Sequence, residues 1–147
     1  MRKNAYLVPI LLVSFTFNLF SQNELLSRDE LMRTVYHNSI ARAMEEPAKV
    51  IVLDLSSKNL TEFPAEIKEF ENIQMLKLGN NQITAIPGWI DDLKYLQEID
   101  LYMNQVSVLP EDIYKVENLK YFNLYKNNID SISPSIKRLR KLEVLNL

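Results

Sequence analysis

Few side chains in this sequence are of the types that carry out covalent or metal chemistry. The 147 residues include no cysteine and one histidine, His37, so neither a thiolate nucleophile nor a histidine–cysteine zinc site can be assembled. Only two glycines are present, which excludes glycine-rich phosphate-binding loops. Glu98 and Asp100 form a carboxylate pair, but a general acid also needs an enclosed pocket that shifts its pKa. We therefore expect a protein that is not an enzyme and has no cofactor and no metal site.

The charge of the chain is close to balanced. With 17 basic and 19 acidic residues, the formal net charge is -2. Proteins that bind nucleic acid need a concentrated basic surface, so the sequence predicts no nucleic-acid partner. A hydrophobic content of 47% is ordinary for a globular protein, and the length suits one domain with its own core.

The elements that must position the remaining polar residues form a repeat of 23 residues. The stretch from Leu96 to Val106 reads L-x-x-I-x-L-x-x-N-x-V, and the same spacing recurs on both sides of it. Positions 1, 4, 6, 11, 14, 18 and 21 are apolar in every full repeat. A fixed period of this length predicts a solenoid, in which each unit covers the open face of its neighbour. The repeats are 50–72, 73–95, 96–118 and 119–141, followed by a partial unit, 142–147.

These residues resemble the leucine-rich repeat, L-x-x-L-x-L-x-x-N-x-L-x-x-L-P-x-x-I-x-x-L-x-x. The resemblance covers residues 50–147, and the repeats look most like the 23-residue class of the family. It implies an α/β fold, a right-handed solenoid with a parallel sheet on the concave face and short helices or turns on the convex face. The activity that the resemblance implies is protein binding.

The first 21 residues are typical of a secretory signal peptide. Arg2 and Lys3 precede an apolar run from Tyr6 to Phe20, which is shorter than the ~20 residues of a membrane span. Ser21 supplies a small residue where cleavage would fall. We therefore expect residues 1–21 to be removed and the protein to be exported to the periplasm, the cell surface or the medium, without a membrane span. An uncleaved N-terminal anchor is the alternative.

Residues 22–49 predict an N-terminal helical cap. Ser27 and Glu30 form a capping box, apolar residues recur every four positions from Met32 to Met44, and Pro47 ends the pattern. The first unit of a solenoid has no upstream neighbour, so we expect one amphipathic helix to cover it. A helix that docks a partner is the alternative.

Asparagine occupies position 9 of three repeats, where the chain must leave the strand. The side-chain amide of Asn81, Asn104 or Asn127 can bond to backbone groups that the turn sets free, including those of the adjacent repeat.

The candidate binding residues lie on the outward side of the strands. Positions 4 and 6 point into the core, so positions 3, 5 and 7 point out, and equivalent residues form ladders across the sheet. Tyr102 and Tyr125 should therefore lie side by side. The pair can be a binding hot spot or only a ladder that stabilises the sheet. The candidate residues are Lys77, Glu98, Asp100, Tyr102, Tyr121, Asn123 and Tyr125.

The sequence thus predicts an exported, non-catalytic interaction module that binds a protein, or alternatively a glycan, on its concave face. The second hypothesis is a structural or targeting array belonging to a longer protein whose activity lies in a further C-terminal region. The sequence stops six residues into a fifth unit, which would leave an unpaired strand edge. We expect either that relatives continue with more repeats or that two copies associate through this edge.

Overall fold

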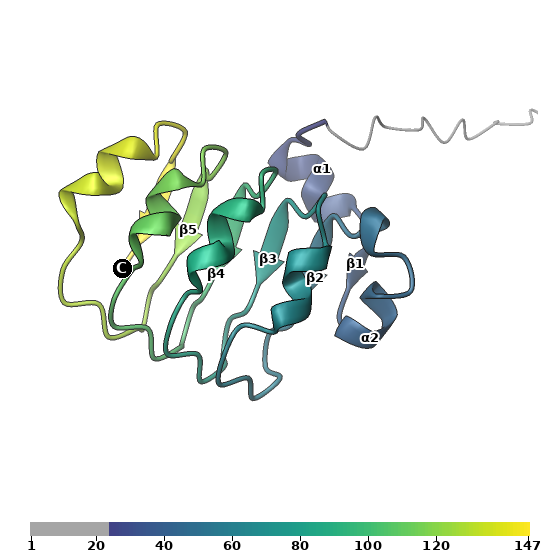
Figure 1. The fold of residues 1–147 in the computed structure, drawn as a ribbon, viewed down its shortest axis with the longest axis horizontal. Helices are drawn as coiled ribbons and strands as arrows, with labels where there is room; N and C mark the ends of the chain where they lie inside the picture. The colour runs from purple at the N-terminus through teal and green to yellow at the C-terminus, as the bar shows by residue number, and fades with distance from the viewer. Residues whose placement is uncertain (1–23) are drawn as a thin grey trace, which may run out of the picture.

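The fold is an open parallel β-sheet with a layer of 3-10 helices on one side (Figure 1). The computed structural model describes residues 24–147, and the expected signal peptide, 1–21, lies outside the described residues. The sheet has six strands in the order β1-β2-β3-β4-β5-β6. The strands are β1 (Tyr36–His37), β2 (Val52–Asp54), β3 (Met75–Lys77), β4 (Glu98–Asp100), β5 (Tyr121–Asn123) and β6 (Val144–Asn146). The helices are α1 (Arg28–Arg33) and α2 (Ile40–Ala43), with 3-10 helices η1 (Pro47–Lys49), η2 (Ala65–Glu69), η3 (Gly88–Asp92), η4 (Glu111–Lys115) and η5 (Pro134–Arg138).

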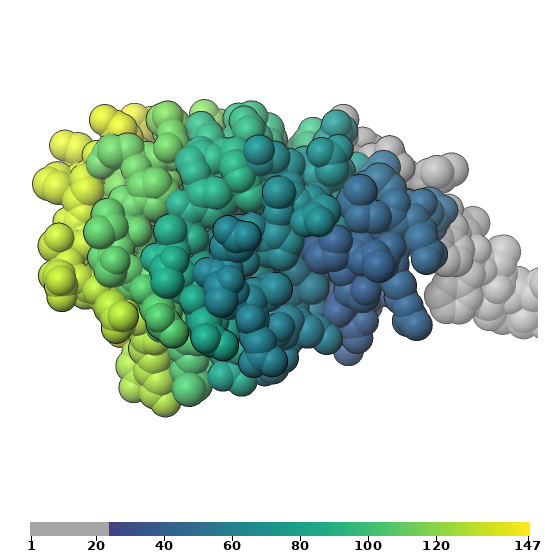
Figure 2. Space-filling view, turned by 60° about the horizontal axis from the view of Figure 1, so that its bottom comes forward, coloured from purple at the N-terminus to yellow at the C-terminus, as the bar shows by residue number. Residues whose placement is uncertain are grey.

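The strand register repeats the spacing of the sequence. Val52 pairs with Met75, Met75 with Glu98, Glu98 with Tyr121, and Tyr121 with Val144, each 23 residues apart. The expected solenoid with a parallel sheet is confirmed, and its units stack in chain order from the cap to the yellow C-terminal repeat (Figure 2).

The core lies between the sheet and the layer of 3-10 helices. Side chains at positions 4 and 6 of the strands, such as Ile99 and Leu101, are fully buried there. Isoleucines from the opposite layer, Ile67, Ile90 and Ile113, meet them in the same cluster. In η2, η3 and η4 a proline directly precedes the helix, where its fixed φ and missing N–H cost nothing. Because each unit's core faces the next unit, burial is continuous through the array.

The position-9 asparagines join neighbouring repeats, as expected. Asn104 Oδ1 accepts the Ile83 backbone N–H (2.9 Å), while its Nδ2 donates to the carbonyls of Leu78 (2.9 Å) and Leu101 (3.0 Å). Asn104 is only 7% exposed, so these backbone groups have no access to water as a substitute. Asn81 and Asn127 bond in the same way to their own repeat and to the preceding one.

The expectation of one long capping helix is wrong. Helix α1 ends at Arg33, and Tyr36–His37 then form strand β1, which pairs in parallel with β2. The edge of β2 presents unpaired N–H and C=O groups, and a short strand satisfies them where a helix could not. The four-residue apolar spacing does not mark a buried face, because Met32 is 57% and Tyr36 59% exposed.

The capping box at the start of α1 is confirmed, and it makes the order of this helix depend on pH. Glu30 Oε2 accepts the Ser27 hydroxyl (2.7 Å) and backbone N–H (2.8 Å), and these hydrogen bonds lower the pKa of Glu30. A lowered folded-state pKa means that this stabilisation is present above the unfolded value, about 4.5, and is lost as pH falls through the folded value. We expect the amide resonances of α1 to shift toward random-coil values in acid, measured by NMR. Glu30→Gln should remove this titration, and an identical titration in that variant would contradict the account.

Candidate functional site

The outer face of the sheet, which we call the concave face, is partly covered by the chain itself. Its residues are the outward strand positions 3, 5 and 7, on the side away from the 3-10 helices. At position 3, Val52 and Met75 are buried at 3% and 0% exposure because Leu31 of α1 packs on them. Burying a leucine side chain contributes about 2 kcal/mol, which favours this position of α1 on the sheet.

Two glutamines fasten the segment that precedes α1 to the same face. Gln74 Oε1 accepts the Leu26 backbone N–H (2.8 Å), and Gln74 Nε2 donates to the Glu24 carbonyl (2.8 Å). Gln97 Nε2 donates to the Leu26 carbonyl (2.9 Å) and to Gln74 Oε1 (2.9 Å). Both glutamines are buried, and among the described residues no buried side-chain polar atom lacks a partner. The backbone of residues 24–26 is therefore held by side chains that precede two neighbouring strands, β3 and β4.

Arg28 extends this cover to β4 and β5. Its Nε lies 3.0 Å from Glu98 Oε2, and its guanidinium carbon lies 4.5 Å from the centre of the Tyr121 ring. The hydrogen bond to Glu98 raises the pKa of Arg28, although burial opposes the shift. Tyr121 donates its hydroxyl to Glu143 (2.8 Å), and this bond raises the pKa of Tyr121. Glu98 and Tyr121, expected as open binding residues, are instead engaged by the chain's own N-terminal segment.

Position 5 remains open to solvent beyond this cover. Lys77, Asp100 and Asn123 are all half-buried there, on three neighbouring strands. Asp100 Oδ1 accepts the Tyr102 N–H (2.9 Å) and Asn123 Nδ2 (3.0 Å). Among the described residues, Asp100 Oδ2 and the Lys77 ammonium have no hydrogen-bond partner, so both groups can meet a ligand.

Tyr102 and Tyr125 lie side by side at position 7, as expected. Their rings stack with centroids 6.0 Å apart and an interplanar angle of 18°. Lys126 Nζ lies 5.3 Å and 5.7 Å from the two ring centres and donates to the Tyr102 hydroxyl (3.0 Å). This bond raises the pKa of Lys126. Tyr125 is 51% exposed, which leaves much of its ring available.

Two hollows adjoin these residues. One of about 560 Å³ is lined by Tyr102, Asn123, Tyr125 and residues 145–147, beside the tyrosine stack. A smaller one of about 140 Å³ lies between the covered and open parts of the face and includes Arg28, Asp100 and Asn123 in its lining. The two hollows share Asn123, so position 5 connects them.

The candidate residues therefore divide into two groups. Asp100, Tyr102, Asn123 and Tyr125 are linked through contacts along the open part of the face, and Lys77 lies beside Asp100 at one end. Glu98 and Tyr121 lie beneath Arg28. Sequence reasoning missed Arg28 and Lys126. The signal for the first was the apolar Val52 and Met75 at outward positions, because an apolar residue on an open face indicates a cover.

The described residues 24–147 show no cluster of His, Cys, Asp or Glu that could hold a metal ion. Within the same range, no helix has the length and apolar character needed to cross a bilayer.

Comparison with known proteins identifies the repeats. Residues 48–106 and 118–139, together more than half of the chain, match family models described as leucine rich repeat. The chain belongs to the leucine-rich repeat family. Leucine-rich repeats generally mediate protein–protein interaction and are typically not enzymes. No curated protein sequence matches the chain.

Two solved leucine-rich-repeat structures are similar to it. A protein of Leptospira interrogans is 29% identical with a TM-score of 0.57, and the match covers 74% of this chain and 34% of that one. The ectodomain of an Arabidopsis thaliana membrane receptor kinase, in complex with Casparian strip integrity factor 2, is 31% identical with a TM-score of 0.57. That match covers 63% of this chain and 12% of the ectodomain. The chain thus spans about a third of the length of the first protein and much less of the second.

Proposed function

We propose that this chain binds a protein partner through the open part of its concave face. The observation that carries the proposal is the stacked pair of half-buried Tyr102 and exposed Tyr125, next to an Asp100 carboxylate oxygen that has no partner among the described residues. Tyrosines combine a large apolar contact area with a polar tip, and they are enriched among residues that dominate binding energy.

The chemistry of the open face supports a polar, partly apolar contact. Lys126 supplies a cation on the tyrosine stack, Asp100 an acceptor and Asn123 an amide next to it, and Lys77 adds a second cation on the neighbouring strand, in register with Asp100. A partner that combines backbone amides with apolar side chains can use all of these groups. The pair also stabilises the sheet, as any cross-strand aromatic pair does, but sheet stability requires no exposed ring.

We also propose that the protein acts outside the cytoplasm. The support is the N-terminal sequence, in which Arg2 and Lys3 precede the apolar run of residues 6–20 and a small residue follows at Ser21. N-terminal sequencing of the protein recovered outside the cell should begin after residue 21. Recovery of intact Met1 in the cytoplasm would contradict export.

A capture experiment tests the concave site. Immobilised wild-type protein and the variant Tyr102→Ala/Tyr125→Ala are incubated with extracellular proteins collected from the environment in which the source organism grows. The bound proteins are then quantified by mass spectrometry. The double variant should capture at least tenfold less of the specific partner than wild type does. Two hot-spot residues together contribute more than about 1.4 kcal/mol to the binding free energy, which corresponds to a tenfold change in affinity. Tyr95→Ala is the matched control because Tyr95 is half-buried beside η3, outside the concave face. Equal capture by the double variant would refute the site.

Protease treatment tests whether the partner is a protein. Digestion of the extracellular sample before incubation should abolish capture, whereas capture that survives digestion would indicate a glycan.

A further inference from the structure

The fourth convex turn differs in charge from the other three. Residues 65–72, 88–95 and 111–118 each contain more acidic than basic residues. The equivalent residues 134–141 contain four basic residues and no acidic one. In a chain with a net charge of -2, these cations are concentrated on one turn of the solenoid. We call Lys137, Arg138, Arg140 and Lys141 the basic turn.

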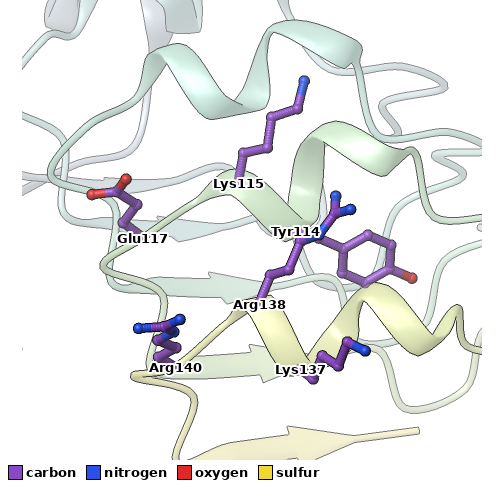
Figure 3. Close-up of a pocket in the computed structure, with 6 residues that line it drawn as sticks. All are labelled: Tyr114, Lys115, Glu117, Lys137, Arg138 and Arg140. Atoms are coloured by element: carbon purple, nitrogen blue, oxygen red, sulfur yellow. The ribbon is translucent and has the colours of Figure 1, made fainter.

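The basic turn borders a hollow of about 570 Å³ on the convex side (Figure 3). The hollow lies between the end of η4 and the end of η5 and is lined by Tyr114, Lys115, Glu117, Lys137, Arg138 and Arg140. Figure 3 places Glu117 and Arg140 at one end of it, with Lys137 and Arg138 toward Tyr114. Four of its six lining residues are cationic, so the hollow attracts anions.

Most of the positive charge of the basic turn is not neutralised by acidic side chains of the described residues. Lys115 is paired with Asp112 at 2.6 Å, but Arg138 lies 3.7 Å from Glu111, and both of those side chains are largely exposed. Among residues 24–147, Lys137 and Arg140 have no ion pair. Like charges held on one turn repel one another, and an external anion relieves that repulsion.

The exposure of the basic turn determines which anion fits. Each exposed contact is weak and screened by salt, so a single small anion gains little, whereas a ligand with many regularly spaced charges engages several cations together. Tyr114, which lines the hollow, is 2% exposed, so among residues 24–147 the hollow offers no aromatic ring on which single-stranded nucleic-acid bases could stack. We propose that the basic turn binds an anionic polysaccharide through its sulfate or phosphate esters. This site is separate from the concave face and independent of the protein partner proposed above.

Binding of fluorescent dextran sulfate, measured by anisotropy at 50 and 300 mM NaCl, tests the proposal. Wild-type protein should bind at low salt and lose most of its affinity at high salt. Lys137→Gln/Arg138→Gln/Arg140→Gln should bind at least fivefold more weakly. The matched control Arg33→Gln/Arg42→Gln/Lys58→Gln removes three exposed cations elsewhere and should stay within twofold of wild type. A thermal unfolding midpoint equal to wild type in both variants verifies that each is folded.

The proposal would be overturned by absence of binding by wild-type protein, by equal weakening in the control variant, or by binding to phosphatidylglycerol vesicles without binding to dextran sulfate. The last outcome would assign the basic turn to a lipid surface. Competition by millimolar inorganic phosphate at constant ionic strength would likewise contradict a requirement for a multivalent ligand.

Discussion

Replacing Asn104 by alanine should lower the free energy of unfolding by about 3 kcal/mol, because each buried backbone group left without a partner costs about 1–3 kcal/mol. The substitution removes the acceptor of the Ile83 N–H and the donor to the Leu78 and Leu101 carbonyls. A loss of this size is large against the total stability of a domain, about 5–15 kcal/mol. Urea denaturation followed by circular dichroism measures it.

Gln105→Ala is the control for this prediction. Gln105 is the next residue, is exposed, and its side chain has no hydrogen bond to the described residues. Its replacement should change stability by less than about 0.5 kcal/mol. If Asn104→Ala were equally mild, the asparagine would not be what joins the repeats.

Replacing Phe122 by alanine should cost about 3–5 kcal/mol, the usual range for deleting a buried aromatic ring. Phe122 is 1% exposed, lies in β5, and is in register with Ile99 on one side and Leu145 on the other. Phe122→Leu keeps most of the volume and should cost less than about 1.5 kcal/mol. Unfolding in denaturant measures both variants.

The Phe122 variant should also show where stability is lost. Because each repeat contacts only its neighbours, the cavity should weaken the fourth repeat more than the first. Amide hydrogen exchange should therefore accelerate in residues 119–147 while residues 50–95 stay protected. Uniform acceleration along the chain would mean that the array unfolds as one cooperative unit.

The sequence predicts those parts of the fold that are set by the repeat itself. The buried side chains of β4, the bonds of Asn104 and the stack of Tyr102 on Tyr125 all follow from the 23-residue spacing, since equivalent residues must lie on neighbouring strands. These contacts depend on a single period of 23 residues, which occurs in all four full repeats and can therefore be recognised in the sequence.

The cap could not be predicted in the same way, because it occurs once. Its apolar residues fit a helical period, but satisfying the edge of β2 favours a strand at Tyr36–His37 instead. The path of residues 24–31 across the sheet depends on long-range bonds from Gln74 and Gln97 to the backbone of Leu26. No local pattern contains that information, so the engagement of Glu98 by Arg28 became evident only in the structure.

Because the N-terminal segment covers one part of the concave face, the proposed binding site is limited to the open part. A partner must contact the open part, from Lys77 to Tyr125, unless it displaces α1 and breaks the contact of Leu31 with Val52 and Met75. That displacement would cost the burial of Leu31, about 2 kcal/mol, in addition to the Arg28–Glu98 pair. The open part is therefore the less costly place to bind.

Site-specific photo-crosslinking tests the central claim most directly. A photoreactive phenylalanine analogue is placed at Tyr125 in one variant and, in another, at Val108, which is 71% exposed outside the concave face. The partner should be crosslinked from position 125 and not from position 108. Crosslinking from position 108 alone would contradict the assignment of binding to the concave face.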